Sequence, residues 1–420
     1  MSFQPGALTA AQERMGTLFT PNQILGRTQP IGCTAVEITQ RCNLDCTLCY
    51  LSEHSESVRD IPIDEIFNRL DEIRRLYGQR VHVQITGGDP TLRKHTELIE
   101  IVRYASSLGL YPALFTNGIA ASRKLLKALA AAGLKDIAFH VDMTQRREGF
   151  TSEIELCELR DDYIARTQGL GLTVLFNTTL GDHNIDELAG LVQYFLKRAE
   201  CVSFASFQMQ AATGRGEWGA RQETLTAPAV RAQIDRAVGR SLPWDVIRIG
   251  HPDCHAYVPL IVAGGETVPV IEDRKLFAEF IADFAAVKAD RHSSPWALLW
   301  RYLRATLRRP RWIWRALRHA GHLLYELRGG LQRSRPQRLS LFVHDFMDAS
   351  ALDPERTAAC SFMVMTADGP LSMCEHNAKR DNHILKPITF IDRRGEQQTF
   401  VPFDARRAEK KLAGAANKVA

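Results

Sequence analysis

Short runs of β-branched and aromatic residues alternate along the chain with longer stretches whose apolar residues recur at helical spacing. The stretch from Ile63 to Tyr77, for example, places apolar side chains on one helical face. Strands separated by helices predict a parallel sheet with right-handed crossovers. The predicted strands are Cys33 to Thr39, Val81 to Thr86, Tyr111 to Thr116, Asp136 to Asp142, Leu172 to Thr178, Val202 to Phe207 and Trp244 to Ile249. The predicted helices lie around 63–77, 98–108, 125–132, 185–199 and 227–238.

Three closely spaced cysteines, Cys42, Cys46 and Cys49, follow the first predicted strand. Three thiolates on one short loop can hold three irons of a [4Fe-4S] cluster and leave the fourth iron open to a chelating ligand. A zinc knuckle on Cys46, Cys49 and His54 is the alternative. Structural zinc takes four protein ligands, however, and Arg59 stands where the last one is needed. The spacing therefore favours an iron–sulfur cluster.

Two further features accompany these cysteines. Tyr50 directly follows the third cysteine, and Gly87-Gly88-Asp89-Pro90 follows the second predicted strand. Together the motifs resemble the radical S-adenosylmethionine (SAM) superfamily. The resemblance implies an α/β fold, an open (β/α)6 partial TIM barrel, with the motifs at the carboxyl ends of its strands. It also implies that SAM chelates the open iron and is cleaved reductively to a 5′-deoxyadenosyl radical, which abstracts hydrogen from the substrate.

The same resemblance names the residues expected to bind SAM. In the superfamily the double glycine presents backbone oxygens to the SAM amino group, and Gly87 and Gly88 carry no Cβ that would obstruct a ligand. Asp89 stands where the family usually has glutamate, and it is expected near SAM together with Tyr50.

Polar residues also end the next predicted strands. Asn117 and Asn177 are expected to bind SAM, although such residues are as often helix caps or turn formers. No general base stands out from the sequence. His140 and His251 are the catalytic candidates.

A second cysteine group lies beyond the predicted barrel: Cys254, Cys360 and Cys374. Asp368-Gly369 predicts a turn between two short strands, which brings the last two cysteines together. This arrangement resembles the auxiliary-cluster segment of many radical SAM enzymes and predicts a second [4Fe-4S] cluster. The fourth ligand stays open among Cys33, Cys201, His255, His376, substrate or none.

The segment from Arg291 to Arg338 is strongly basic, with twelve arginines, no lysine and one acidic residue, Glu326. Four of the six tryptophans lie within it, at positions 296, 300, 312 and 314. Arginine interleaved with tryptophan and leucine is typical of an amphipathic helix on an anionic bilayer. Nucleic acid is the competing partner, and a solvated basic surface is the plain alternative.

Composition bounds the class of protein. A chain of 420 residues with nine cysteines predicts an intracellular protein with reduced thiols. The chain contains no run of eighteen apolar residues, so the sequence predicts no membrane span. We expect a cytoplasmic enzyme, with peripheral contact to the inner face of the cell membrane through 291–338. The expected parts are an N-terminal extension (1–30), the partial barrel (31–250), a helical basic segment (251–345), an auxiliary iron–sulfur segment (346–395) and a tail (396–420).

A looser likeness concerns the substrate. The stretches from Phe207 to Arg215 and from His344 to Asn377 are similar to parts of the tetraether lipid synthases. That likeness implies a lipid substrate and carbon–carbon bond formation or modification at unactivated carbons, with a reductant such as ferredoxin or flavodoxin.

Two other functions stay open. One is a radical SAM peptide-modifying enzyme with an auxiliary cluster, which usually carries an additional N-terminal peptide-binding module. Residues 1–30 look too short for such a module. The other is a zinc-stabilised nucleic-acid-binding protein, against which the order of the motifs argues.

Overall fold

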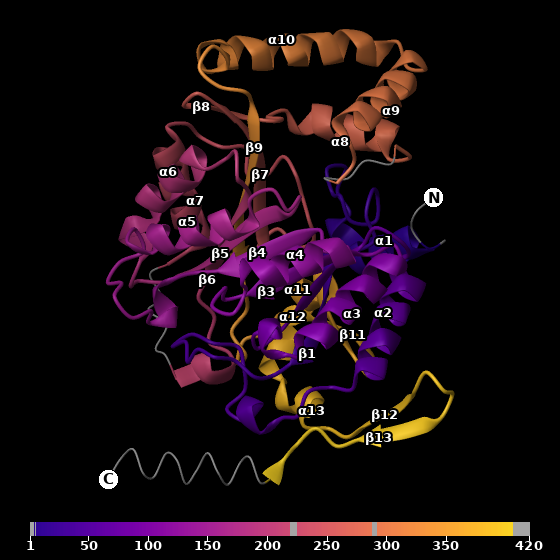
Figure 1. Cartoon of the computed structure of the whole chain (residues 1–420). Helices are drawn as coiled ribbons and strands as arrows, with labels where there is room; N and C mark the ends of the chain where they lie inside the picture. The colour runs from indigo at the N-terminus through magenta and orange to yellow at the C-terminus, as the bar shows by residue number, and fades with distance from the viewer. Residues whose placement is uncertain (1–3, 5, 219–224, 288–291, 406–420) are drawn as a thin grey trace.

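The computed structural model describes residues 4, 6–218, 225–287 and 292–405 (Figure 1). Within these residues one sheet of eleven strands dominates the fold, in the order β11-β10-β1-β2-β3-β4-β5-β6-β9-β7-β8. The strands are β1 (Cys33–Thr39), β2 (His82–Gly87), β3 (Tyr111–Thr116), β4 (Asp136–His140), β5 (Thr173–Leu180), β6 (Val202–Met209), β7 (His255–Ala263), β8 (Glu266–Pro269), β9 (Gln337–Asp345), β10 (Phe362–Thr366) and β11 (Gly369–Ser372).

The helices and a separate hairpin complete the fold. Those of the barrel are α2 (Ile63–Tyr77), α3 (His95–Ser107), α4 (Arg123–Ala132), α5 (Leu156–Thr167), α6 (Leu188–Lys197) and α7 (Ala227–Val238), preceded by α1 (Ala7–Met15). The later elements are α8 (Arg274–Phe284), α9 (Pro295–Leu307), α10 (Arg311–Leu331), α11 (Pro354–Ala358), α12 (Met373–Ala378), α13 (Asp381–Ile384) and the hairpin of β12 (Ile388–Ile391) and β13 (Gln397–Phe400).

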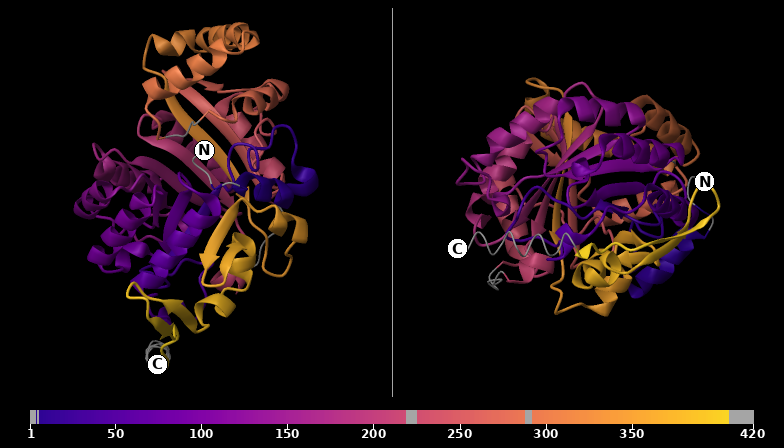
Figure 2. Two further views of the ribbon diagram at one scale, coloured as in Figure 1. Left: turned by 90° about the vertical axis from the view of Figure 1, so that its right-hand side faces the viewer. Right: turned by 60° about the horizontal axis from the view of Figure 1, so that its bottom comes forward.

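The predicted partial barrel is confirmed. Strands β1 to β6 are parallel neighbours in chain order, and the sheet curls with helices along its outer side (Figure 2). Helix α2 illustrates the cause, because its buried stripe of Ile66, Leu70 and Ile73 recurs at helical spacing while its first turn is acidic and its last turn basic. Burial of such stripes against the apolar strands builds one continuous core.

The predicted seventh strand, Trp244 to Ile249, is wrong. Apart from an isolated bridge between Arg248 and Gln23, this segment consists of turns and loop. Pro243 has no N–H for a ladder, and the indole of Trp244 donates a hydrogen bond to Asp235 of α7 at 2.8 Å. The place beside β6 belongs instead to β9, which comes from much later in the chain and pairs parallel to β6.

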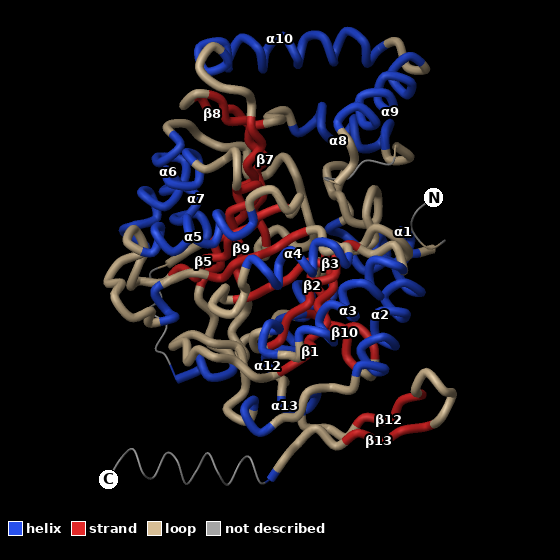
Figure 3. Tube along the Cα trace, viewed as in Figure 1, coloured by secondary structure: helices blue, strands red, loops and turns tan. Residues whose placement is uncertain are grey.

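The C-terminal half is divided between the two ends of the barrel. Helices α8, α9 and α10 lie beyond the amino ends of the parallel strands, at the top of Figure 1, while α13 and the β12–β13 hairpin lie at the opposite end (Figures 1 and 3). Strand β7 runs antiparallel to β9 and connects these ends. The range 251–345, expected to be helical, therefore also contains β7, β8 and β9. Of the parts predicted above, positions 1–3 and 5 of the N-terminal extension, 219–224 of the barrel, 288–291 of the basic segment and 406–420 of the tail lie outside the described residues.

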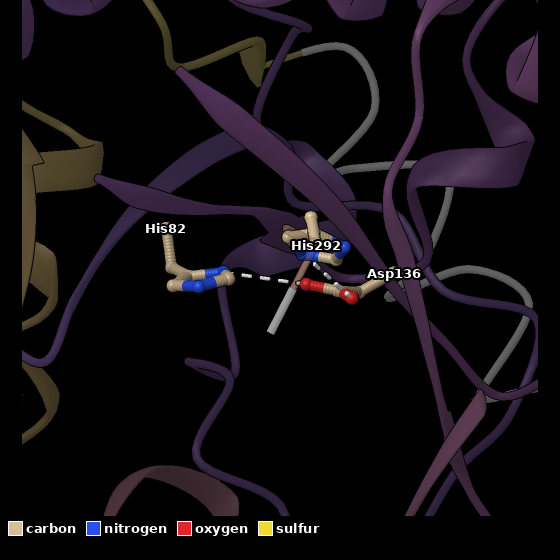
Figure 4. Close-up of side chains that lie close together, drawn as sticks. All are labelled: His82, Asp136 and His292. Carbon is tan, nitrogen blue, oxygen red and sulfur yellow. Dashed lines mark ion pairs between the residues drawn. The ribbon is translucent and has the colours of Figure 1, made fainter. Parts of the chain in front are cut away.

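Three side chains fasten the segment before α9 to the amino end of the barrel (Figure 4). The carboxylate of Asp136, fully buried at the start of β4, lies 3.3 Å from Nδ1 of His82 and 3.3 Å from Nε2 of His292. The ring of Tyr111 packs edge-on against His292. These contacts, together with the packing of α10 on β7 and β8, hold the helical extension on this end of the molecule.

Candidate active site at the barrel mouth

The three cysteines of the first motif lie on the loop that follows β1. Cys42, Cys46 and Cys49 all line one cavity at the carboxyl ends of the barrel strands, where barrel enzymes carry their sites. The loop has no regular secondary structure, and two backbone hydrogen bonds anchor it, from Thr47 N to Thr144 O at 3.0 Å and from Gly216 N to Cys49 O at 3.1 Å. The structure therefore brings the three thiols to a single concave surface.

The double glycine packs against the start of this loop. The N–H of Gly88 donates to the carbonyl of Thr39 at 2.8 Å, and the N–H of Asp89 donates to the carbonyl of Arg41 at 2.7 Å. A Cβ on Gly88 would overlap the carbonyl oxygen of Arg41, and a Cβ on Gly87 would overlap that of Thr39. The sequence predicts that the two glycines leave room for a ligand. In the structure, the absence of a Cβ at these positions leaves room for the backbone at the start of the cysteine loop.

Asp89 faces away from the cavity. Its buried carboxylate accepts hydrogen bonds from Thr91 N at 2.9 Å, Thr116 Oγ1 at 2.8 Å and Asn117 N at 2.9 Å. Asp89 therefore ties the end of β2 to the end of β3. The structure does not bring this residue to the cavity as a SAM contact, because the protein already uses its oxygens.

The other residues expected to bind SAM line the cavity: Tyr50, Gly87, Gly88, Asn117 and Asn177. The hydroxyl of Tyr50 donates to the carbonyl of Gly87 at 2.6 Å, and burial raises the pKa of Tyr50 well above its usual range. The amide of Asn117 donates to Asn43 Oδ1 at 2.7 Å and lies 3.8 Å from the sulfur of Cys42.

The two catalytic candidates are far from equivalent. His140 lines the cavity, and its Nε2 lies 2.6 Å from the buried carboxylate of Asp142 and 3.2 Å from Thr179 Oγ1. Burial alone would lower the pKa of His140, but the charge of Asp142 outweighs burial and raises that pKa. His251 does not line the cavity. It lies beside Asp253 and Glu355 instead.

The comparisons with known proteins agree with this geometry. Residues 36–195 match the family model described as the Radical SAM superfamily. The chain therefore contains a radical SAM domain over these residues. This superfamily implies a [4Fe-4S] cluster and SAM as cofactors.

Among characterised proteins, the chain is 29% identical over 245 residues to the PqqA peptide cyclase of Xanthomonas oryzae pv. oryzae (strain MAFF 311018), covering 55% of this chain and 62% of that protein. It is 27% identical over 186 residues to the 7,8-dihydro-6-hydroxymethylpterin dimethyltransferase of Methanocaldococcus jannaschii, covering 43% and 36%. The chain thus spans less than two thirds of the length of these relatives. Among solved structures, Streptococcus suis SuiB bound to precursor peptide SuiA has a TM-score of 0.40 at 14% identity, covering 55% and 48%.

The thiols of the radical SAM domain lie in surroundings that suit a metal cluster. Burial raises the pKa of Cys42 and Cys46, and the other cysteines of the loop raise it further. A coordinated metal reverses this effect, since it deprotonates a ligating thiol. The guanidinium of Arg215 donates to the sulfur of Cys49 at 3.3 Å and to Asp45 at 2.9 Å, so a positive charge already faces the thiol positions. Three thiols from one loop, facing a shared cavity, fit a [4Fe-4S] cluster with one open iron.

Sequence reasoning did not assign Arg215 or the buried pair of Glu37 and Arg380 to the site. Glu37 lines the cavity from β1, and its carboxylate lies 2.8 Å from the guanidinium of Arg380. Burial would raise the pKa of Glu37, but Arg380 outweighs burial and lowers it to about 2. Arg380 also stacks on the ring of Tyr50. A glutamate within an apolar strand was the one available signal for this pair.

The second cysteine group also comes together. Asp368-Gly369 lies at the turn of the β10–β11 hairpin, as predicted, with Cys360 before β10 and Cys374 after β11. Burial, with a contribution from the nearby Cys360, raises the pKa of Cys254 to about 11 and that of Cys374 to about 12. The guanidinium of Arg356 on α11 donates to the sulfur of Cys254 at 3.3 Å.

The residues named for the fourth ligand lie in different places. Cys201 precedes β6 and so lies at the amino end of the barrel, away from this group. Cys33 accepts a hydrogen bond from Gln84, and His376 lies 4.0 Å from Glu37. His255 directly follows Cys254, and its Nε2 lies 2.6 Å from the hydroxyl of Ser361, the residue after Cys360. Burial lowers the pKa of His255 to about 3, so its imidazole is neutral, the form that binds metals.

Gly88→Ala tests the close approach of the two backbones. The added Cβ has no room beside the carbonyl of Arg41, so the variant should lose about 3 kcal/mol of stability and lower the thermal unfolding midpoint. Gly321→Ala is the matched control, because that exposed helical glycine has open space around its Cβ and should become slightly more stable. Equal midpoints for the two variants would contradict the packing argument.

The pairing of His140 with Asp142 predicts a pH dependence. Because the folded pKa of His140 is raised, its stabilisation is full below the unfolded pKa of about 6.5 and is lost as the pH rises through the folded value. The difference in unfolding midpoint between the parent and His140→Gln should therefore be largest in mildly acidic buffer and should shrink as the pH rises. Anaerobic thermal unfolding across this range measures it, and a constant difference would refute the pairing.

Proposed function

We propose that this protein is a radical SAM enzyme that modifies a peptide, with its [4Fe-4S] cluster on Cys42, Cys46 and Cys49. The observation that carries the proposal is the convergence of these three thiols on one cavity, opposite the double glycine at the end of β2. When bound and reduced, the cluster supplies the electron that cleaves SAM to a 5′-deoxyadenosyl radical. A reductant such as ferredoxin or flavodoxin is expected to deliver that electron.

In this proposal the protein contributes position and shielding. Gly87 and Gly88 line the cavity beside the cysteine loop, and their carbonyls are the groups to which the amino group of SAM would donate. Tyr50 holds the Gly87 carbonyl through its hydroxyl, and Arg380 covers the ring of Tyr50, so the C-terminal segment closes this side of the wall. Asn117 and Asn177 supply amide groups toward the remainder of SAM or the substrate. His140, paired with Asp142, is the titratable group positioned to accept or donate a proton in the cavity.

A peptide substrate has more support than a lipid. The first characterised relative reported above is a peptide cyclase by name. The basic helices α9 and α10, which the sequence associates with lipid, do not line the cavity and lie beyond the amino ends of the strands. The helices with lipid-binding character therefore do not support a lipid substrate in this cavity.

We also propose that Cys254, Cys360 and Cys374 hold a second [4Fe-4S] cluster, with His255 as its fourth ligand. The three thiols are buried near one another, and Arg356 supplies positive charge beside Cys254. The free Nδ1 of His255 supports this assignment, because it is buried and has no hydrogen-bond partner among the described residues. A cluster at this place could pass an electron or hold part of the substrate.

Iron content after anaerobic reconstitution tests both clusters. The variant Cys42→Ala/Cys46→Ala/Cys49→Ala should lose about four irons and all formation of 5′-deoxyadenosine from SAM and dithionite. The variant Cys254→Ala/Cys360→Ala/Cys374→Ala should lose about four other irons. Cys157→Ala/Cys201→Ala, which changes cysteines outside both groups, should retain the parent's iron content. Stoichiometric zinc with no SAM cleavage in the parent would favour the zinc-stabilised nucleic-acid binder instead.

Deuterium transfer distinguishes a peptide from a lipid substrate. Extract from cells grown in deuterated medium is separated into peptide and lipid fractions, and each is incubated with the reconstituted enzyme, SAM and reductant. The peptide fraction should place deuterium in 5′-deoxyadenosine, measured by mass spectrometry, because the radical abstracts hydrogen from its substrate. Deuterium from the lipid fraction alone would refute the peptide proposal and leave the cluster assignment standing.

A further inference from the structure

Helices α9 and α10, called the arm below, form a two-helix projection at the amino end of the barrel (Figure 1). One face of the arm is packed. Leu327 is buried against Ala263 and Val268 of the β7–β8 hairpin, and Trp312 is buried against Phe280 and Phe284 of α8. Two ion pairs, Arg311 with Asp283 and Arg315 with Glu279, fasten α10 to α8. The arm is therefore held firmly by contacts on its inner face.

The opposite face of α9 carries an apolar stripe that nothing in the described structure covers. Trp296 and Trp300 are 73% and 67% exposed, and Leu299, Leu303 and Leu307 continue the same stripe at intervals of three and four residues. An apolar stripe at helical spacing ordinarily faces a core. On α9 a different residue, Tyr302, packs on Phe280 of α8. The exposed stripe is therefore a second apolar face of the helix, and it points outward.

Helix α10 also carries exposed apolar residues. Its exposed apolar residues are Ile313, Trp314, Leu317, Leu324 and Tyr325, with Trp314 exposed to 73%. Of the fifteen large apolar side chains exposed in the described part of the chain, ten therefore lie on the arm. Scattered exposed apolar residues need no explanation, but so many concentrated on two neighbouring helices mark a binding surface.

The charges of the arm identify the partner. Between positions 295 and 331 the chain carries eight arginines and one acidic residue. Arg304 and Arg308 are exposed on one flank of the α9 stripe, and Arg318 is exposed on α10. Tryptophan rings suit the boundary between headgroups and acyl chains, and arginine pairs with anionic headgroups while its stem covers apolar surface. No described helix is long and apolar enough to cross a bilayer, so the arm would lie in the plane of the interface.

We propose that the outer face of α9 and α10 binds the surface of an anionic phospholipid bilayer. The fold then sets the orientation. Strand β7 runs from His255, beside the auxiliary cysteines, to Ala263, which contacts α10, a span of about 26 Å at the usual rise per residue. The arm and the mouth of the barrel lie at opposite ends of the molecule (Figures 1 and 2). The docked enzyme therefore opens toward the aqueous phase, and its membrane contact leaves the active site free for a water-soluble substrate.

Vesicle cosedimentation of the full chain tests this proposal. The parent should bind vesicles of phosphatidylcholine with phosphatidylglycerol, bind phosphatidylcholine alone much more weakly, and lose binding as salt rises. Arg304→Gln/Arg308→Gln/Arg318→Gln should weaken binding to the anionic vesicles about a hundredfold, at roughly a factor of five per neutralised arginine. The matched control is Arg103→Gln/Arg236→Gln/Arg394→Gln, which removes the same charge from exposed sites outside the arm and should bind like the parent.

The variant Trp296→Ser/Trp300→Ser/Trp314→Ser tests the contribution of the exposed apolar residues to vesicle binding. These rings are exposed, so the variant should keep the parent's unfolding midpoint and its 5′-deoxyadenosine formation while losing vesicle binding. In the parent, lipids brominated on their acyl chains should quench the tryptophan fluorescence. Equal binding by the arm and control arginine variants would overturn the proposal. So would a lipid-independent dimer that the tryptophan variant abolishes, since the occupant of the face would then be a second copy of the chain.

Discussion

The ends of β1 and β2 approach each other so closely that no side chain fits between their backbones. Two peptide N–H groups of the glycine motif donate to carbonyls of the segment that carries the cysteine loop, and a Cβ at either glycine would overlap those carbonyls. This contact fixes the first residues of the loop relative to the sheet. Because the loop has no secondary structure of its own, this contact at its start and the backbone hydrogen bonds of Thr47 and Cys49 further along it set where the three thiols lie.

Two buried carboxylates, Asp89 and Glu37, hold the elements around the same site together. Asp89 joins β2 to β3 from behind, and Glu37 recruits Arg380 from a segment more than three hundred residues away in the chain. A buried carboxylate is costly unless it is paired and hydrogen-bonded, so each one specifies its partner strongly. The C-terminal segment therefore belongs to the barrel mouth through an ion pair as well as through the β1–β10 pairing.

The two ends of the barrel carry different chemical groups. The carboxyl end gathers thiols, amides and a paired imidazole around a cavity, whereas the amino end carries the arm, with its arginines and its uncovered apolar face. β7 and β9 span the distance between these ends and keep them apart. The proposed membrane contact at one end is thus compatible with the proposed chemistry on a peptide at the other, so the lipid-like signal in the sequence does not conflict with a relative named as a peptide cyclase.

The sequence by itself determined the features that depend on neighbouring residues. Cysteine spacing, the double glycine, six strands, five of the six barrel helices and the amphipathic basic segment all appear as local patterns, because a loop's ligand set and an element's period are properties of consecutive positions. Only the tertiary structure decided the rest. In the structure β9, not Trp244 to Ile249, pairs with β6, and Asp89 points away from the cavity. Glu37 pairs with Arg380, and the arm lies at the amino end of the barrel. Each of these depends on partners distant in the chain, and a local pattern does not specify which distant group will satisfy a buried charge or a strand edge.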